Sequence, residues 1–313
     1  MIFFLNSVIS FSQELFPNTE PASTIPKKVV GFRQINESYK DFNNRPRYYA
    51  GFRFMYGLTK KLTVMTTIGA SNHHFRKIPG NFTGYITNHH KITYPTNPFL
   101  TEGVNVYAKY RLVNFDGEQK HLRIAGYATA TKSFIAHTEG ESSLMTDNTG
   151  YGAGLIFTRL YKRFATSVTW GFIKSQAYKQ QDQYHEIEFK AGDVKIYDIS
   201  FGYRLYPKKY DSYDDINVNI YAEFINRDYE AAKISYDGVP YNYDFLNTNT
   251  NGTMYTYKGL IANRYSELRS SLQFIFSSTN RLDIGVAVPV YSRSYLHDYP
   301  LVFINFQRYF FPN

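Results

Sequence analysis

A two-residue alternation of apolar and polar side chains constrains this chain more than any other feature. Residues 282–290, LDIGVAVPV, show it most clearly, with Leu282, Ile284, Val286, Val288 and Val290 on one face. Successive side chains of a β-strand point to opposite faces of the sheet, so the pattern predicts strands with one apolar and one wetter face. We expect about twelve such strands, near 29–38, 47–57, 62–71, 104–112, 121–134, 150–160, 164–173, 197–205, 216–224, 265–277, 282–290 and 301–311.

Short and long connections between these segments alternate along the chain. Short ones lie at 58–61, 116–120, 161–163, 208–215 and 278–281. Longer polar ones lie at 39–46, 72–99, 135–149, 174–193, 225–264 and 292–300. Short turns on one side and long loops on the other are typical of a transmembrane up-and-down barrel. The sequence therefore predicts an all-β fold, an antiparallel barrel of about twelve strands over residues 28–313. It would have periplasmic turns and termini and long extracellular loops.

A soluble β-barrel or sandwich with its apolar face inward is the alternative, but it does not account for the asymmetry of the connections. Aromatic side chains in the outward phase gather near the strand ends, as the interfacial girdles of membrane barrels do. The short-turn set is Tyr56, Tyr110, Phe164, Tyr203 and Phe276, and the long-loop set is Tyr48, Tyr151, Phe172 and Tyr197. We expect them to contact the lipid of a Gram-negative outer membrane.

The two ends of the chain carry further signals. Residues 1–12, MIFFLNSVISFS, have the length and apolar character of a secretory signal peptide with a small-residue cleavage site. Residues 13–27 contain several prolines and turn formers, which predicts an extended N-terminal segment. At the other end, Tyr309, Phe310 and Phe311 resemble the terminal aromatic signal that barrel-assembly machinery reads.

Several stretches resemble a known group of proteins: ELFPNTEPAST (14–24), MYGLTKKLTVMTTIGASNHH (55–74), NVYAKYRL (105–112), GYGAGLIFTRL (150–160), FGYRLYPKKY (201–210) and FQRYFF (306–311). Together they are similar to transporter-like outer-membrane β-barrel proteins of the Bacteroidota type. The resemblance implies an outer-membrane location and a barrel fold. It implies neither a substrate nor a catalytic residue.

Charged side chains in the inward phase are the candidate lining of a solute path. They are mostly basic: Arg33, Arg53, Lys109, Arg111, Arg123, Arg204 and Arg269, against Glu223, Asp198, Asp283 and Glu37. Rings of basic side chains favour anionic solutes, which predicts a passive or facilitating channel for a small anionic solute. An interior salt-bridge network that fills a narrow barrel is the competing interpretation.

The runner-up function is a structural or accessory barrel without an open pore. Its loops would bind a protein partner or a surface polysaccharide, and the tyrosine-rich connection 225–264 suits such a surface. No enzyme is expected, because the sequence contains neither a G-x-S-x-G nor an H-E-x-x-H motif. The net charge of +9 is spread along the chain, so no nucleic-acid partner is expected.

Histidines concentrate in the predicted loops. The pairs His73–His74 and His89–His90 share the connection 72–99, and neutral imidazoles can bind Zn²⁺ or Cu²⁺. These four residues form a candidate metal site, with ordinary hydrogen-bonded loop histidines as the alternative. The chain has no cysteine, which excludes disulfides and thiolate ligands. We expect no cofactor.

Overall fold

The computed structural model describes residues 15–40, 46–72, 99–117, 120–135, 146, 148–181, 186–208, 215–240, 263–291 and 298–312. The predicted signal peptide, 1–12, lies outside these residues. So do the metal candidates His73, His74, His89 and His90. Within the described residues, no helix is both long and apolar enough to cross a membrane.

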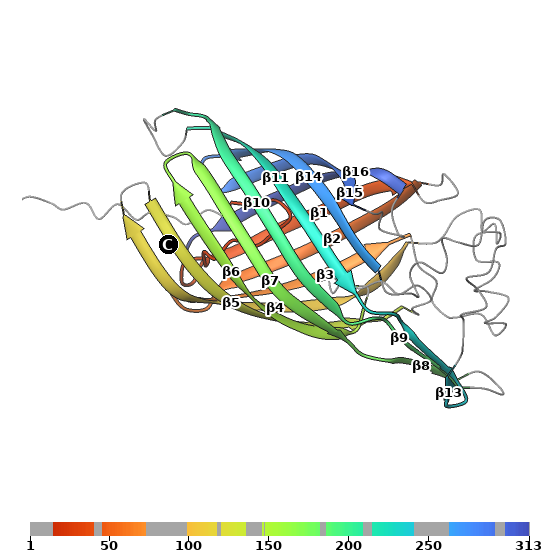
Figure 1. The fold of residues 1–313 in the computed structure, drawn as a ribbon. Helices are drawn as coiled ribbons and strands as arrows, with labels where there is room; N and C mark the ends of the chain where they lie inside the picture. Colours follow the sequence, from red (N-terminus) through yellow and green to blue (C-terminus); the bar gives the residue numbers. More distant parts are fainter. Residues whose placement is uncertain are drawn as a thin grey trace, which may run out of the picture.

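The described strands include twelve that form one closed barrel, in the order β1-β16-β15-β14-β11-β10-β7-β6-β5-β4-β3-β2 (Figure 1). All neighbours are antiparallel, which confirms the predicted all-β architecture. The strands are β1 (Val30–Lys40), β2 (Pro46–Gly57), β3 (Leu62–Ser71), β4 (Leu100–Gly117), β5 (Lys120–Ser133), β6 (Gly150–Tyr161), β7 (Phe164–Ser175), β10 (Val194–Tyr206), β11 (Asn217–Tyr229), β14 (Asn263–Phe276), β15 (Asn280–Tyr291) and β16 (Asp298–Phe310).

The first and last strands close the barrel. Val30 lies opposite Phe310 of β16 on one side and Tyr56 of β2 on the other, and the β1–β16 register continues as far as Lys40 opposite Asp298. Because β1 has partners on both sides, its backbone groups need no water. We call the end of the barrel that carries the connections 58–61 and 162–163 the short-turn end, and the opposite end the long-loop end.

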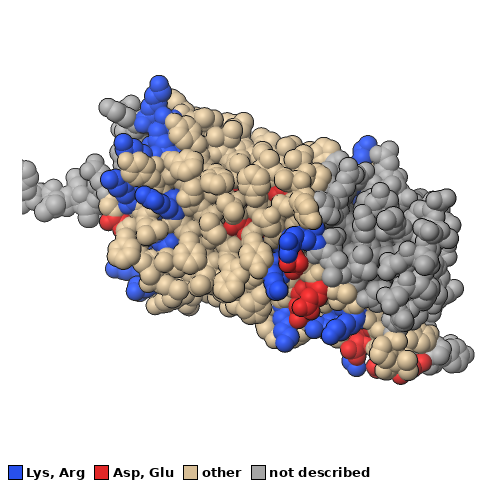
Figure 2. All heavy atoms as spheres, viewed as in Figure 1, with Lys and Arg blue, Asp and Glu red and all other residues tan. Residues whose placement is uncertain are grey.

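The two faces of each strand differ as the alternation predicts. On β10, Ile199 and Phe201 are 41% and 38% exposed, whereas Ser200 between them is 1% exposed. Figure 2 shows Lys and Arg gathered towards the two ends of the barrel, with a broad and largely uncharged band between them. All nine aromatic side chains expected in the girdles are exposed: Tyr48, Tyr56, Tyr110, Tyr151, Phe164, Phe172, Tyr197, Tyr203 and Phe276.

Two predicted loops contain strands that the sequence interpretation missed. A separate sheet has the order β13-β12-β9-β8, with β8 (Tyr178–Gln181) and β9 (Glu186–Lys190) from the connection 174–193. β12 (Lys233–Tyr236) and β13 (Val239–Pro240) come from the connection 225–264. This sheet projects beyond the long-loop end (Figure 1). The prediction failed there because it sought segments of membrane-spanning length, and these strands are shorter and flanked by polar residues.

The apolar outer band makes a depth-dependent prediction about added charge. Val286 lies in the middle of β15 and Val290 near its long-loop end, both facing outward. We expect Val286→Arg to lower the free energy of unfolding in lipid vesicles by about 2–4 kcal/mol, and Val290→Arg by no more than about 1 kcal/mol. Denaturant unfolding followed through Trp170, the only tryptophan, measures both. Equal costs at the two depths would contradict a membrane-embedded band.

Candidate functional site

Residues 15–29, here called the N-terminal segment, lie inside the barrel. The segment meets strands on several sides of the wall. Gln273 of β14 donates to the Leu15 carbonyl at 3.3 Å, and the Ala22 amide donates to Thr158 Oγ1 of β6 at 2.9 Å. The Ile25 amide donates to Thr63 Oγ1 of β3 at 2.8 Å. An extended segment was predicted over 13–27, but its position in the lumen was not.

Glu20 anchors the segment to the basic inner wall. Its Oε1 lies 2.8 Å from Arg53 Nη1 of β2, and its Oε2 lies 2.9 Å from Lys109 Nζ of β4. Lys109 Nζ also donates to the Pro21 carbonyl at 2.8 Å, and the Lys109 side chain is only 1% exposed. A buried ammonium group is costly unless it is paired. Glu20 therefore supplies the negative charge that these two wall cations require.

Glu223 of β11 is a carboxylate of the wall that accepts hydrogen bonds from the segment. Glu223 is fully buried, and its carboxylate accepts hydrogen bonds from the backbone amides of Asn18 and Thr19 at 3.0 and 2.8 Å. The Asn18 Nδ2 and Thr19 Oγ1 groups donate to it as well, at 2.6 and 2.9 Å. Hydrogen bonds to a charged acceptor are stronger than neutral ones. The bend of the segment at 18–19 is therefore fixed by one side chain.

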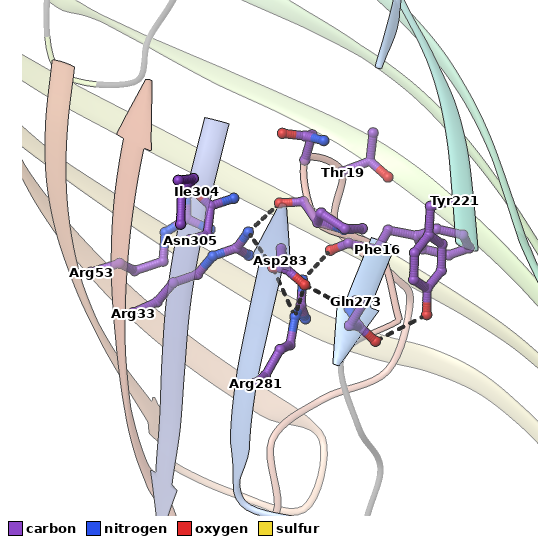
Figure 3. A network of polar contacts seen from close by, with 12 residues as sticks. Phe16, Thr19, Arg33, Arg53, Tyr221, Gln273, Arg281, Asp283, Ile304 and Asn305 are labelled. Atoms are coloured by element: carbon purple, nitrogen blue, oxygen red, sulfur yellow. Dashed lines mark hydrogen bonds and ion pairs between the residues drawn. The ribbon is translucent and has the colours of Figure 1, made fainter. Parts of the chain in front are cut away.

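A charged network holds the part of the segment nearer the short-turn end (Figure 3). Asp283 of β15 accepts from Arg281 Nε at 2.8 Å, and Arg33 Nη2 of β1 lies 3.6 Å from its Oδ2. The same two arginines also reach the segment: Arg281 Nη2 donates to the Phe16 carbonyl at 3.0 Å, and Arg33 donates to the Pro17 carbonyl. Wall charges thus satisfy backbone acceptors of the segment.

Apolar contacts complete the fit. Phe16 is 1% exposed and packs edge-on against the Tyr221 ring, with a centroid distance of 5.5 Å (Figure 3). Ile25 packs with Met55 and Met65 of the wall. Fully burying one such side chain contributes about 1.5–3 kcal/mol. The segment is therefore held by both polar and apolar contacts.

Gly57 makes room for the return of the segment to β1. A Cβ atom added there would lie 1.9 Å from the Pro26 carbonyl oxygen, which is impossible without movement. The Lys28 amide donates to the Gly57 carbonyl at 2.7 Å, so the two backbones run in direct contact. From the sequence, this glycine was expected only as the last residue of the strand near 47–57.

The eleven charged residues predicted to line the path all lie on inward positions of their strands, although their role in a solute path stays a prediction. Glu37 pairs with Arg269 at 2.6 Å. Arg33, Arg53, Lys109, Arg269 and Glu223 contact the N-terminal segment. Asp283 supports Arg33, and Asp198 pairs with Arg227 at 2.5 Å. Arg111 donates to the Lys60 carbonyl, Arg123 pairs with Asp116 and Arg204 lies near the short-turn end.

Glu20 is the contact residue that the sequence interpretation missed. Basic residues outnumbered acidic ones in the predicted lining, and this imbalance was the available signal that an acid from elsewhere enters the lumen. Arg281 and Glu267 were also missed, the latter an inward residue that pairs with Arg269 at 2.7 Å. Among the described residues, no group of three metal-ligating side chains comes together.

Removal of the Glu20 charge should loosen the segment. The chain has no cysteine, so a single Ser23→Cys substitution at a buried position reports exposure of the segment to a thiol reagent. We expect Glu20→Gln to raise the labelling rate by about tenfold or more, since a loss of about 1.4 kcal/mol changes an equilibrium tenfold. Glu230→Gln, at an exposed glutamate, is the matched control. Unchanged labelling in Glu20→Gln would contradict the anchoring role.

The close approach at Gly57 gives an independent test with the same cysteine reporter. Gly57→Ala forces the Pro26 carbonyl away and should also increase labelling of Ser23→Cys. Gly126→Ala is the control, because a Cβ there meets nothing nearer than 3.8 Å. If both alanine variants label at the wild-type rate, the segment does not depend on this contact.

Comparison with known proteins supports the assignment of the fold. No protein-family model matches the sequence, and no curated protein sequence matches it. Among solved structures, an outer membrane channel of Pseudomonas putida F1 is 10% identical with a TM-score of 0.52, covering 95% of this chain and 100% of that one. The β-domain of the Bordetella autotransporter BrkA is 11% identical with a TM-score of 0.43, covering 90% and 99%. The closed twelve-strand barrel and the likeness to the Pseudomonas channel show that the chain has the fold of an outer-membrane β-barrel.

Proposed function

We propose that this protein is a passive outer-membrane channel for a small anionic solute, and that the N-terminal segment closes its lumen. One observation carries the proposal: residues 15–29, which belong to no strand of the wall, lie in the lumen and are held there by ion pairs and hydrogen bonds. A barrel with only a structural role could fill its interior with its own side chains, as small barrels do. The N-terminal segment would leave a path through the lumen if it moved out.

The charge of the wall supports the choice of solute. Withdrawal of the segment would remove Glu20 from Arg53 and Lys109, and the Phe16 carbonyl from Arg281. Those cations would then face a water-filled lumen from β2, β4 and β15. Basic side chains around a pore favour anions. The same groups that bind the segment would thus select the solute.

The segment joins the barrel at the short-turn end, where β1 begins. In outer-membrane barrels the short turns lie on the periplasmic side. The closing element would therefore be inserted from the periplasm. The cell outer membrane of a Gram-negative bacterium is the proposed location, and the absence of an enzymatic function stays a prediction.

A structural or accessory barrel is the second candidate, and the sheet of β8, β9, β12 and β13 favours it. This sheet projects beyond the long-loop end and has a packed side, with Ile187 and Phe189 at 0% and 1% exposed. An ordered projection on the extracellular side suits a protein or polysaccharide partner. The two candidates differ in whether the barrel conducts once the segment is displaced.

Planar-bilayer recordings distinguish them. We expect wild-type protein to show little conductance, and deletion of residues 15–26 to produce stepwise anion-selective currents. Glu20→Lys, which places a third cation beside Arg53 and Lys109, should open the lumen without shortening the chain. In either open variant, Arg53→Ala should reduce the preference for chloride over potassium.

Folding must be verified first, by the heat-dependent gel mobility of the barrel and by Trp170 fluorescence. If folded deletion and Glu20→Lys variants are both silent, the channel is wrong and the structural barrel stands. Glu230→Gln controls for loss of an acidic charge outside the lumen and should behave as wild type.

A further inference from the structure

Gln307 of β16 is a buried side chain whose hydrogen bonds are not made. It lies on an inward position of the strand and is 1% exposed. Within the part of the chain that the structure describes, neither its Nε2 nor its Oε1 has a hydrogen-bond partner. The large majority of buried side-chain polar atoms in proteins have at least one partner. The exception at Gln307 therefore calls for a physical explanation.

The neighbours of Gln307 explain why its amide is left without a partner. Arg33 of β1 and Arg281 of β15 lie opposite Gln307 on the two adjacent strands. A guanidinium group offers no acceptor to the Gln307 amide. Both arginines direct donors to Asp283 and to carbonyls of the N-terminal segment (Figure 3). The Gln307 oxygen therefore receives no hydrogen bond from either side.

The N-terminal segment covers this part of the wall. The two arginines beside Gln307 donate to consecutive carbonyls of the segment, those of Phe16 and Pro17. Tyr309, the next inward residue of β16 towards the short-turn end, packs against the apolar cluster that includes Ile25 of the segment. The groups around Gln307 thus contact the segment on three sides. Withdrawal of the segment would bring the amide into contact with lumen water.

We propose that Gln307 favours withdrawal of the N-terminal segment from the lumen. In the closed form, the described residues offer its amide no partner, whereas water would hydrate the amide in the open form. A buried polar group without a hydrogen bond costs free energy that a satisfied group does not. An interaction made in only one of two states shifts the equilibrium towards that state. The proposal rests on the movement of the segment that the proposed function requires.

Gln307 would then act against the contacts that hold the segment. Glu20 pairs with two wall cations, and Glu223 accepts from two backbone amides of the segment. The cost at Gln307 offsets part of this binding, so the segment is held less tightly than these contacts alone would hold it. The wall therefore contains both the groups that close the lumen and one that promotes its opening.

Thiol labelling of the Ser23→Cys chain measures the effect. Gln307→Met replaces both polar atoms of the amide by an apolar side chain of similar length. Since the closed form then no longer contains an unsatisfied amide, we expect labelling to slow by about tenfold. Unchanged or faster labelling would show that the amide is satisfied in the closed form, and would overturn the proposal.

Gln273→Met is the matched comparison, because Gln273 of β14 is equally buried but fully used. It is 0% exposed, and its Nε2 donates to the Leu15 carbonyl at 3.3 Å and to Asp283 Oδ1 at 3.0 Å. The same substitution there removes a contact to the segment, so labelling should become faster. Opposite signs at the two glutamines support the proposal. Slower labelling in both would assign the effect to the added apolar surface and overturn it.

Folding of each variant is verified by heat-dependent gel mobility, and Gln307→Leu replaces Gln307→Met if the latter does not fold. Labelling is measured without ion flow, so it fails separately from the channel. Slower labelling in Gln307→Met together with silent bilayers would refute the channel and retain the role of Gln307. Conducting bilayers with unchanged labelling would refute the role of Gln307 alone.

Discussion

The pairing of β1 with β16 closes the barrel, and the other features of the fold follow from it. A membrane offers no water to backbone amides and carbonyls, so a sheet that spans it must have no free edge. The ladder from Val30–Phe310 to Lys40–Asp298 removes that edge. Once the sheet is closed, the two-residue alternation assigns every strand residue to lipid or to the lumen. The outer band and the charged interior are both consequences of closure.

Closure also creates an electrostatic problem inside. The wall brings Arg33, Arg53, Lys109 and Arg281 into a narrow space with Glu223 and Asp283, and each buried charge needs a partner. Part of the demand is met within the wall, by Arg281 with Asp283. The remainder is met by the N-terminal segment, whose Glu20 pairs with two cations and whose carbonyls accept from two arginines. The segment is thus part of the charge balance of the barrel.

The dependence of the wall on the segment has a functional meaning. In the proposed channel, the groups that the N-terminal segment satisfies would become available to a solute when the segment leaves. In that channel, one set of cations would hold the closed form and select an anion. The same cations can serve both roles because long basic side chains line a small lumen.

The fold was open to prediction from the sequence because its signals are local. Alternation in 197–205 or 282–290 and the lengths of the connections need no knowledge of contacts between distant residues, and they predicted both the strands and their inner and outer faces. The short strands β8 and β12 were not predicted, because four residues are too few to show a clear alternation. The inward phase of Arg53 and Lys109 was also predictable.

The contacts of those cations arise only once the chain has folded. Lys109 and Glu20 are 89 residues apart in numbering, and Asn18 and Glu223 are 205 apart. No local pattern specifies which strand a proline-rich segment meets after the barrel has closed. The alternation of side chains is enough to predict a barrel with a basic interior, because it is a property of each strand. The folded chain alone decided that its own N-terminal segment occupies that interior, because burial of charge is settled between strands and not within them.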